Sequence, residues 1–205
     1  MSNLKIESDF IDFYDNLNND NSVLIYKRYL KNCKQRGTDM KYLRSLGVKT
    51  IELKQVNQLI GYNGQIVVYT DPKAHNGYGK MIMNVDEAML SYSNCLASPY
   101  YFTENNLSIK YLQIGKRRFN LCFQKPEPLS LNCGTLIDIK ESEPQYNRLI
   151  GLPIFSIDYI STGREMIATD FNEVQNLQIL GMNNYISSES IIEEVIQSLA
   201  IYNKY

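Results

Sequence analysis

Residues 154–172 read IFSIDYISTGREMIATDFN, and this stretch decides the fold class of the chain. Two runs rich in β-branched and aromatic residues, LPIFSIDYI (152–160) and EMIATDF (165–171), flank the turn residues STGR. This arrangement predicts an antiparallel hairpin. Asp158 lies in the first run and Asp170 in the second, each among apolar neighbours. A carboxylate in an apolar strand is costly to bury unless it is paired or binds a cation.

The two acids and a nearby amide predict a magnesium site. Asp170 and Asn172 are two residues apart, so an extended strand places both on one face. In a hairpin, Asp158 comes opposite them on the neighbouring strand. Two carboxylates and an amide oxygen are hard ligands of the kind that Mg²⁺ combines with phosphate oxygens. The alternative, that both acids lie on the solvent face of an edge hairpin, stays open on residue types alone.

Three other stretches predict helices. The first begins at Asp39, with Asp39 or Thr38 as its N-cap, and ends at Gly47 in the C′ position. The second follows Asn84, which can cap it. The third begins at Ser187 and has an apolar face made of Ile191, Ile192, Val195, Ile196 and Leu199.

The remaining apolar runs predict strands. They are residues 49–53, 65–70, 109–114, 119–124 and 136–139. The runs 109–114 and 119–124 flank the polar turn GKRR and predict a second hairpin. Helices mixed irregularly with mostly antiparallel strands predict an α+β fold.

The composition excludes several classes of protein. The chain has 205 residues with 21 Lys and Arg against 22 Asp and Glu, so its net charge of −1 favours neither a nucleic-acid nor a membrane partner. No apolar run approaches the roughly 20 residues that span a bilayer. The first ten residues carry acids where a signal peptide has basic and then apolar residues. We therefore expect a soluble, cytoplasmic protein.

Schemes that need histidine or paired cysteines are also excluded. The 4 cysteines are scattered without a C-x-x-C pair, so no structural zinc site is expected. His75 is the only histidine, which excludes every Cys-His or Ser-His-Asp scheme that does not use it. The chemistry is expected to depend on carboxylates, amides, lysines and backbone groups.

Residues 70–80, TDPKAHNGYGK, form a Gly-rich loop after the strand QIVVY. Gly77 and Gly79 allow the backbone to approach a ligand closely, and amides in such a turn can hold phosphate. Lys73 and Lys80 add positive charge. An ordinary turn between strands stays open as the alternative.

Basic residues of the second hairpin divide into two kinds. Lys110 and Lys125 lie on or at the end of expected strands, where their side chains can point into a cleft. The residues at the tip are expected in a solvated turn: Lys116, Arg117 and Arg118. Asn132, in LNCG, by itself indicates a turn.

The order of these segments resembles the ATP-binding part of the ATP-grasp superfamily, the carboxylate–amine ligases that include glutathione-synthetase-like enzymes. The matching segments are KYLRSLGVKT, VVYTDPKAHNGYGK, SIKYLQIGKRRF, LNCG, FSIDYI and IATDFNEVQNLQILG, within residues 39–199. The resemblance implies two small α+β lobes with mostly antiparallel sheets that enclose a nucleotide cleft. Residues 39–104 would form the smaller lobe, 105–205 the larger lobe with the metal-binding hairpin, and 1–38 a short remnant of the preceding region.

The resemblance also assigns roles to single residues. It implies that Mg²⁺ binds to Asp158, Asp170 and Asn172. The residues implied to hold ATP are Lys41, Lys73, Gly77, Gly79, Lys80 and Lys110, with Glu104 of the segment YYFTE at the adenine. Two catalytic residues are implied: Lys125, near a basic position that contacts the transferred phosphate, and Asn132, which matches the asparagine before the final hairpin.

The implied activity is an ATP- and Mg²⁺-dependent ligase that activates a carboxylate as an acyl phosphate and joins it to the amine of a small molecule or peptide. Two departures stand out: Thr70 replaces a lysine at the end of the strand before the loop, and Asp170 replaces the usual Glu. Thr70 favours the alternative, a non-catalytic nucleotide-binding or regulatory protein with the same fold. Because the family's N-terminal lobe is mostly missing, we expect a homo-oligomer or a partner protein, contacted through residues 10–14 and 23–29.

Overall fold

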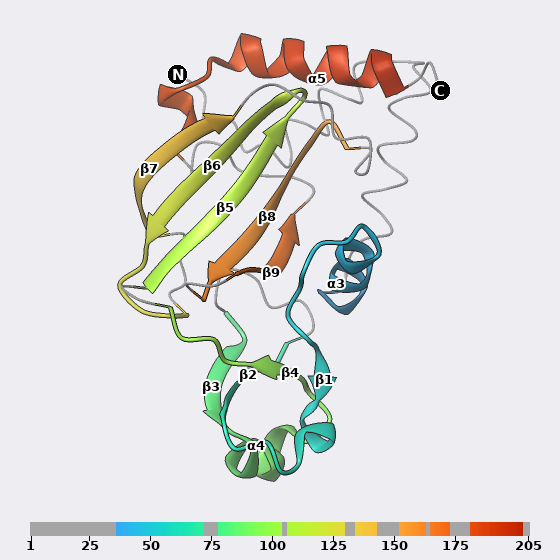
Figure 1. Ribbon diagram of the computed structural model, residues 1–205, viewed down its shortest axis with the longest axis vertical. Helices are drawn as coiled ribbons and strands as arrows, with labels where there is room; N and C mark the ends of the chain where they lie inside the picture. Colours follow the sequence, from blue (N-terminus) through green and yellow to red (C-terminus); the bar gives the residue numbers. More distant parts are fainter. Residues whose placement is uncertain are drawn as a thin grey trace.

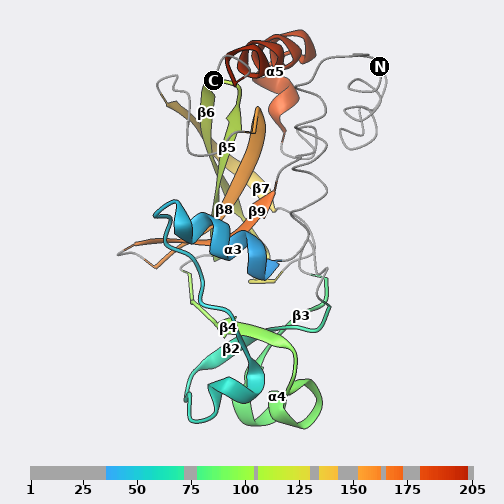
Figure 2. The same ribbon diagram turned by 90° about the vertical axis from the view of Figure 1, so that its right-hand side faces the viewer.

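Two antiparallel β-sheets form the framework of the chain, one at each end of its long axis (Figure 1). The computed structural model describes residues 36–71, 78–103, 106–129, 134–142, 152–162, 165–172 and 181–202. Helix α3 (Arg36–Ser45) lies beside the larger sheet and α5 (Ser188–Tyr202) lies across its far end (Figure 1, Figure 2). The fold is α+β, as the sequence predicts. Among the described residues, no helix is long and apolar enough to cross a membrane.

The smaller sheet has the strand order β1-β4-β2-β3. Its strands are β1 (Lys54–Gln55), β2 (Gln65–Tyr69), β3 (Lys80–Asn84) and β4 (Leu96–Pro99). The 3-10 helix η1 (Val56–Leu59) and α4 (Val85–Tyr92) pack on it and share a buried core that includes Val56, Ile66, Val68, Met83, Ala88 and Ala97. Asn84 takes the N-cap position of α4, as predicted, although its side chain makes no capping hydrogen bond.

The larger sheet has the strand order β7-β6-β5-β8-β9. Its strands are β5 (Leu107–Ile114), β6 (Arg117–Gln124), β7 (Thr135–Ser142), β8 (Ile154–Ser161) and β9 (Met166–Asn172). Both predicted hairpins form, as the pairs β5·β6 and β8·β9. The turn between β5 and β6 is shorter than predicted, because Arg117 pairs with Ile114 within the ladder. Its side chain also forms an ion pair with Glu141 of β7 at 2.7 Å.

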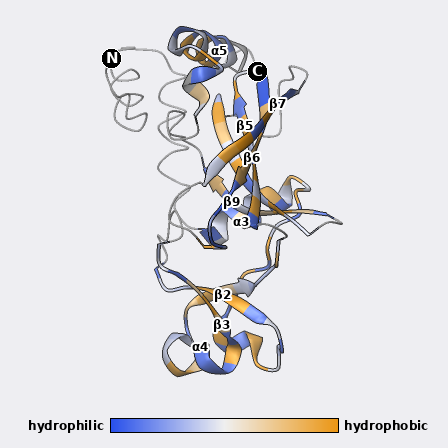
Figure 3. Ribbon diagram, turned by 90° about the vertical axis from the view of Figure 1, so that its left-hand side faces the viewer, coloured by the Kyte–Doolittle hydropathy of each residue, from blue (hydrophilic) through white to orange (hydrophobic). Residues whose placement is uncertain are grey.

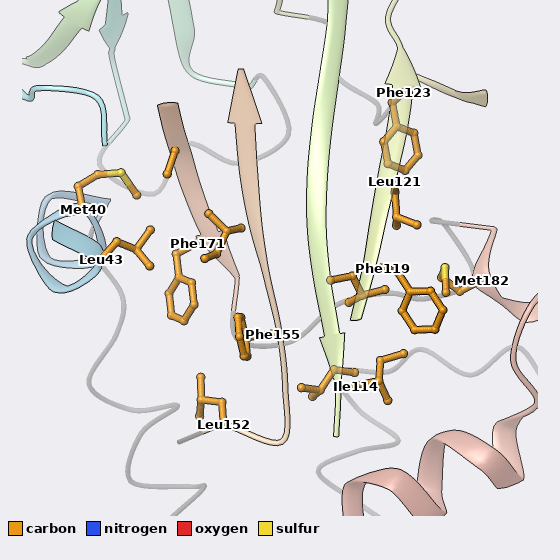
Figure 4. Close-up of a cluster of buried hydrophobic side chains, with 14 of the residues drawn as sticks. Met40, Leu43, Ile114, Phe119, Leu121, Phe123, Leu152, Phe155, Phe171 and Met182 are labelled. Atoms are coloured by element: carbon orange, nitrogen blue, oxygen red, sulfur yellow. The ribbon is translucent and has the colours of Figure 1, made fainter. Parts of the chain in front are cut away.

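Helix α3 packs against β9, the strand at the edge of the larger sheet. Met40 and Leu43 are buried in this contact, and Leu43 points toward Phe171 of β9 (Figure 4). Gly47 follows the helix with φ 82°, as expected for a C′ glycine. The helix includes Arg36, so it begins before the predicted start at Asp39. This difference matters for the functional site.

The segment after α3 is a connector between the sheets rather than the predicted strand 49–53. It makes one parallel bridge, between Thr50 and Ala168 of β9. The Ala168 amide donates to Lys49 O and the Ile51 amide donates to Ala168 O, both at 2.9 Å. The pairing stops there because the chain then leaves β9 for the smaller sheet.

A single hydrophobic cluster links the two sheets. Val67 and Tyr69 of β2 are buried in the same cluster as Phe155 and Ile157 of β8. Because packed apolar groups resist displacement, this shared cluster fixes the smaller sheet against the larger one.

Helix α5 covers the far end of the larger sheet with only part of its apolar face. Of the predicted apolar face, Val195 is buried, whereas Ile192 and Ile196 are exposed. The Ser187 hydroxyl accepts a hydrogen bond from the Ser190 amide at 3.2 Å, so the predicted cap is present. Colouring by hydropathy shows both hydrophilic and hydrophobic stretches on α5 (Figure 3).

We predict that Gly115→Ala destabilises the fold more than Gly47→Ala. Both glycines have a positive φ, which costs about 1 kcal/mol for alanine. A Cβ at Gly115 would also lie 2.6 Å from the backbone oxygen of Glu194 in α5, whereas nothing lies within 4 Å at Gly47. Urea unfolding should give a loss larger by at least about 1 kcal/mol for Gly115→Ala. Equal losses would contradict the contact with α5.

Candidate functional site

A β-bulge in the β8·β9 hairpin determines which face of the sheet carries the acids. Tyr159 pairs with Ala168, but Asp158 pairs with Asp170, so Thr169 is an extra residue on β9. Side chains alternate along a strand, so without this residue Asp158 would lie opposite Thr169 and the two carboxylates would lie on opposite faces. The bulge places both carboxylates on one face. The Thr169 hydroxyl donates to Asp158 O at 3.2 Å, within the bulge.

Lys110 of β5 extends this pair into a row of three charged residues. In the strand register, Lys110 is opposite Asp158, which is opposite Asp170. Lys110 Nζ forms an ion pair with Asp158 Oδ1 and lies 3.4 Å from Ser156 Oγ. The Lys110 side chain is 9% exposed, so its ammonium depends on this carboxylate for charge compensation.

Arg36, in the first turn of α3, forms an ion pair with Asp170. Its Nη2 lies 3.0 Å from Asp170 Oδ2, and its Nη1 donates to Thr169 O at 2.6 Å. The guanidinium carbon also lies 4.9 Å from the ring centroid of Tyr69 in β2. Arg36 therefore contacts both sheets. It lies outside the matching segments, which begin at Asp39, so the resemblance assigns it no role. Because the predicted helix begins at Asp39, no local pattern in the sequence places Arg36 on the helix or beside Asp170.

The neighbouring charges shift the ionisation of Arg36 and Tyr69. Burial alone would lower the pKa of the Arg36 guanidinium, but Asp170, Tyr69 and Asp158 outweigh it and raise the pKa above its usual value. Burial raises the pKa of the Tyr69 phenol, which lies 3.3 Å from Ser98 Oγ. Arg36 therefore stays charged and Tyr69 stays neutral at physiological pH.

Lys80 belongs to the same electrostatic cluster. It is the first residue of β3 and pairs with Tyr69 in the register of the smaller sheet. Burial, then repulsion by Arg36, lowers its pKa from 10.5 to about 8, and Lys125 adds to this effect. Asp170 and Asp158 oppose the shift. The protonated form of Lys80 is therefore destabilised in this site, and an added anion would stabilise it.

The arrangement of the two sheets matches solved enzyme structures. One is a D-alanine–D-alanine ligase from Bacillus anthracis in complex with ATP, with a TM-score of 0.51 and 13% identity over 84% of this chain. Another is the ATP-grasp ligase PsnB in complex with a precursor peptide and AMPPNP, with a TM-score of 0.54 and 10% identity over 81% of this chain. The chain has the ATP-grasp fold.

The match concerns the fold and only part of each enzyme. N5-carboxyaminoimidazole synthetase from Staphylococcus aureus gives a TM-score of 0.50 and 12% identity over 81% of this chain. The chain covers 67%, 58% and 50% of the lengths of these three proteins. No protein-family model and no curated protein sequence matches the chain.

Within the ATP-grasp fold, the expected site residues other than Lys41 and Asn172 divide into three groups. Lys80, Lys110, Asp158 and Asp170 interact with one another or with Arg36, and Lys125 acts on Lys80 through its charge. Gly79 precedes Lys80 with φ 67°, and its carbonyl accepts from the Thr70 amide at 2.8 Å. Four residues lie outside the described part of the chain: Lys73, Gly77, Glu104 and Asn132.

Lys41 and Asn172 require separate comment. Lys41 is exposed on α3, and the same helix brings Arg36 rather than Lys41 to Asp170. Asn172 pairs with Ser156 in the register, so it shares the face of Asp170 and Asp158.

The donor set fits magnesium in its chemistry. Asp158, Asp170 and Asn172 supply two carboxylates and an amide oxygen on one face of the sheet. In the described part of the chain, no group of three or more His, Cys, Asp or Glu residues could hold a metal by itself. Both carboxylates already have cationic partners, Lys110 and Arg36. A metal ion at this site would therefore compete with two side chains.

We predict that Lys80 titrates at about pH 8 in the folded protein and near 10.5 in the unfolded chain. Between these values the unfolded chain binds more protons, so the free energy of unfolding should increase with pH. Lys80→Met should remove this increase, whereas Lys54→Met, at an exposed lysine of β1, should retain it. The measurement is urea unfolding from about pH 7.5 to about pH 10.5. Parallel profiles for the wild type and Lys80→Met would contradict the assignment.

Proposed function

We propose that the chain is an ATP- and Mg²⁺-dependent ligase that activates a carboxylate as an acyl phosphate and joins it to an amine. The observation that supports this most is the cluster of three cations, Arg36, Lys80 and Lys110, around Asp158 and Asp170. The cluster lies where Arg36 connects the two sheets of an ATP-grasp fold. Buried charges of both signs at such a junction favour a function over a purely structural role.

In the proposed reaction, a carboxylate oxygen of the donor substrate attacks the γ-phosphorus of ATP. The bond from this phosphorus to the bridging oxygen breaks, and ADP leaves. An amine then attacks the acyl carbon, a C–N bond forms, and phosphate leaves while the amine loses a proton to solvent. Phosphoryl transfer needs mainly positioning and charge neutralisation from the protein. The lysines, the arginine and the carboxylates among the described residues of the site therefore suit this reaction.

Arg36, Lys80 and Lys110 take the phosphate-binding roles in this proposal. Arg36 stands in for Lys41, because α3 brings Arg36 to the acids and leaves Lys41 exposed. Lys80 supplies the cation that Thr70 does not, since it enters the same cluster from the adjacent strand. Each positive charge counts for more in a site with little water, where the effective dielectric is lower.

The remaining residues keep the roles that the resemblance implies. Asp158, Asp170 and Asn172 would hold Mg²⁺, which when bound supplies charge neutralisation to the phosphate oxygens. Lys125 remains a proposed contact of the transferred phosphate. Its amide donates to Asn106 O at 3.2 Å, beside the end of β5.

The acceptor is proposed to be a small molecule or a peptide. PsnB is described with a precursor peptide, whereas D-alanine–D-alanine ligase is named for joining small molecules. Both proteins have the same fold as this chain, so the comparison favours neither a peptide nor a small-molecule acceptor. The proposed contact segments for a partner, residues 10–14 and 23–29, lie outside the described part of the chain.

Thr70 favours a second candidate, a nucleotide-binding protein without turnover. The Thr70 amide donates a hydrogen bond to Gly79 O, and the Thr70 side chain adds no charge to the cluster. Phosphate release with ATP and a panel of amino acids and peptides separates the two functions. Mg-ATP binding without release for any member of the panel would favour the non-catalytic protein.

We predict that Asp170→Ala abolishes most of the Mg²⁺-dependent turnover. The change removes a metal donor and the partner of Arg36, so turnover should fall about 10²-fold or more. Asp138→Ala, at an exposed acid of β7, is the matched control and should keep wild-type turnover. Phosphate release and calorimetric titration with Mg-AMPPNP provide the measurements. Equal Mg-AMPPNP affinity in Asp170→Ala and the wild type would refute the metal assignment.

A further inference from the structure

Tyr69 is the last residue of β2 whose side chain faces the larger sheet. Side chains alternate between the two faces along a strand. Ile66 and Val68 are buried in the core of the smaller sheet, whereas Val67 and Tyr69 are buried in the cluster that the two sheets share. Because β2 ends at Tyr69, the end of this strand presents an aromatic ring to the larger sheet.

The ring of Tyr69 lies against the guanidinium of Arg36. The guanidinium carbon is 4.9 Å from the ring centroid, within the roughly 6 Å at which an aromatic face attracts a cation. Tyr69 and the side chain of Arg36 are each only 8% exposed, and this attraction is stronger when the pair is desolvated. Arg36 also makes a further interaction, so the ring is one contact among several and an experiment has to isolate it.

The smaller sheet holds Tyr69 in place. The Tyr69 hydroxyl lies 3.3 Å from Oγ of Ser98 in β4, and Ser98 is itself buried. The backbone of Tyr69 pairs with Lys80 of β3 on one side and with Leu96 of β4 on the other. A ring fixed in this way offers Arg36 a surface that moves only with the smaller sheet.

The ring attracts the guanidinium without neutralising it. Burial raises the pKa of the Tyr69 phenol, so the side chain stays neutral at physiological pH. Its attraction for a cation comes from the electron-rich face of the ring, which leaves the positive charge of Arg36 available to an anion. A planar guanidinium also stacks on a ring in a defined orientation, which a lysine ammonium cannot do.

We propose that Tyr69 is a positioning residue, whose ring holds the Arg36 guanidinium in the orientation that binds a phosphate of the nucleotide. This role rests on the proposed function for the identity of the ligand. Arg36 belongs to α3, which packs on β9 of the larger sheet, whereas Tyr69 belongs to the smaller sheet (Figure 1). The orientation of Arg36 therefore depends on the position of the smaller sheet.

Replacing the ring tests this role. In calorimetric titrations of the full chain, Tyr69→Leu should weaken Mg-AMPPNP binding about fivefold or more, because the stacking surface is lost. Tyr69→Phe keeps the ring and should bind within about twofold of the wild type. Unchanged affinity in Tyr69→Leu would overturn the proposal. Equal weakening in both variants would assign the effect to the hydroxyl and overturn it as well.

A double-mutant cycle with Arg36→Lys shows whether Tyr69 acts through Arg36. Lysine keeps a positive charge beside Asp170 but lacks the planar group that stacks on the ring. In the Arg36→Lys background, Tyr69→Leu should therefore weaken Mg-AMPPNP binding by less than about twofold. A purely structural role of Tyr69 predicts the same factor in both backgrounds, and that result would overturn the proposal.

Phe119 of β6 provides the matched control. It is a buried ring with the guanidinium carbon of Arg117 at 5.1 Å from its centroid. Arg117 forms an ion pair with Glu141 of β7, at the opposite edge of the larger sheet from β9. Phe119→Leu removes the same kind of contact and should keep wild-type affinity for Mg-AMPPNP. Equal weakening by Phe119→Leu and Tyr69→Leu would indicate a general effect of core packing and overturn the proposal.

Urea unfolding of the same variants separates this inference from the proposed function. The effects of Tyr69→Leu and Arg36→Lys on the free energy of unfolding should be non-additive, whether or not a nucleotide binds. If the wild type binds no Mg-AMPPNP, the proposed function and the phosphate-binding role are both overturned, although the contact is retained. If Mg-AMPPNP binds and the losses of affinity combine independently, only the positioning role is overturned.

Discussion

The ion pair between Arg36 and Asp170 joins three parts of the fold that are distant in sequence. Arg36 begins α3, Asp170 ends the bulge of β9, and the guanidinium lies over Tyr69 of β2. Because both side chains are largely buried, loss of either partner is expected to destabilise the fold. The position of α3, the register of β9 and the approach of the smaller sheet therefore depend on one another.

The bulge at Thr169 is the second constraint, because it sets the face on which Asp170 lies. A regular ladder would direct the two acids to opposite sides of the larger sheet. With the bulge, Lys110, Asp158 and Asp170 form a row across three strands, while Phe171 remains in the core against α3. The same local irregularity thus maintains the apolar packing and creates the charged site.

The charge balance of the site follows from where its cations originate. Lys110 comes from the larger sheet, Lys80 from the smaller sheet and Arg36 from the helix outside both. In the proposed function, this distribution would offset the absence of a lysine at Thr70, because electrostatic compensation depends on position in space and not on position in one strand.

The sequence by itself determined the α+β class and both hairpins of the larger sheet, because alternating apolar runs and turn residues are local signals. It also indicated Asp158 and Asp170 as a pair, but only the bulge of β9 places their carboxylates on one face. Only the tertiary structure decided that Arg36, rather than Lys41, reaches the acids, and that residues 49–53 serve as a connector. It alone also placed the extra residue in β9 and gave Lys80 its altered pKa. These features depend on burial and on charges from distant segments, and neither quantity is encoded in a local pattern of residues.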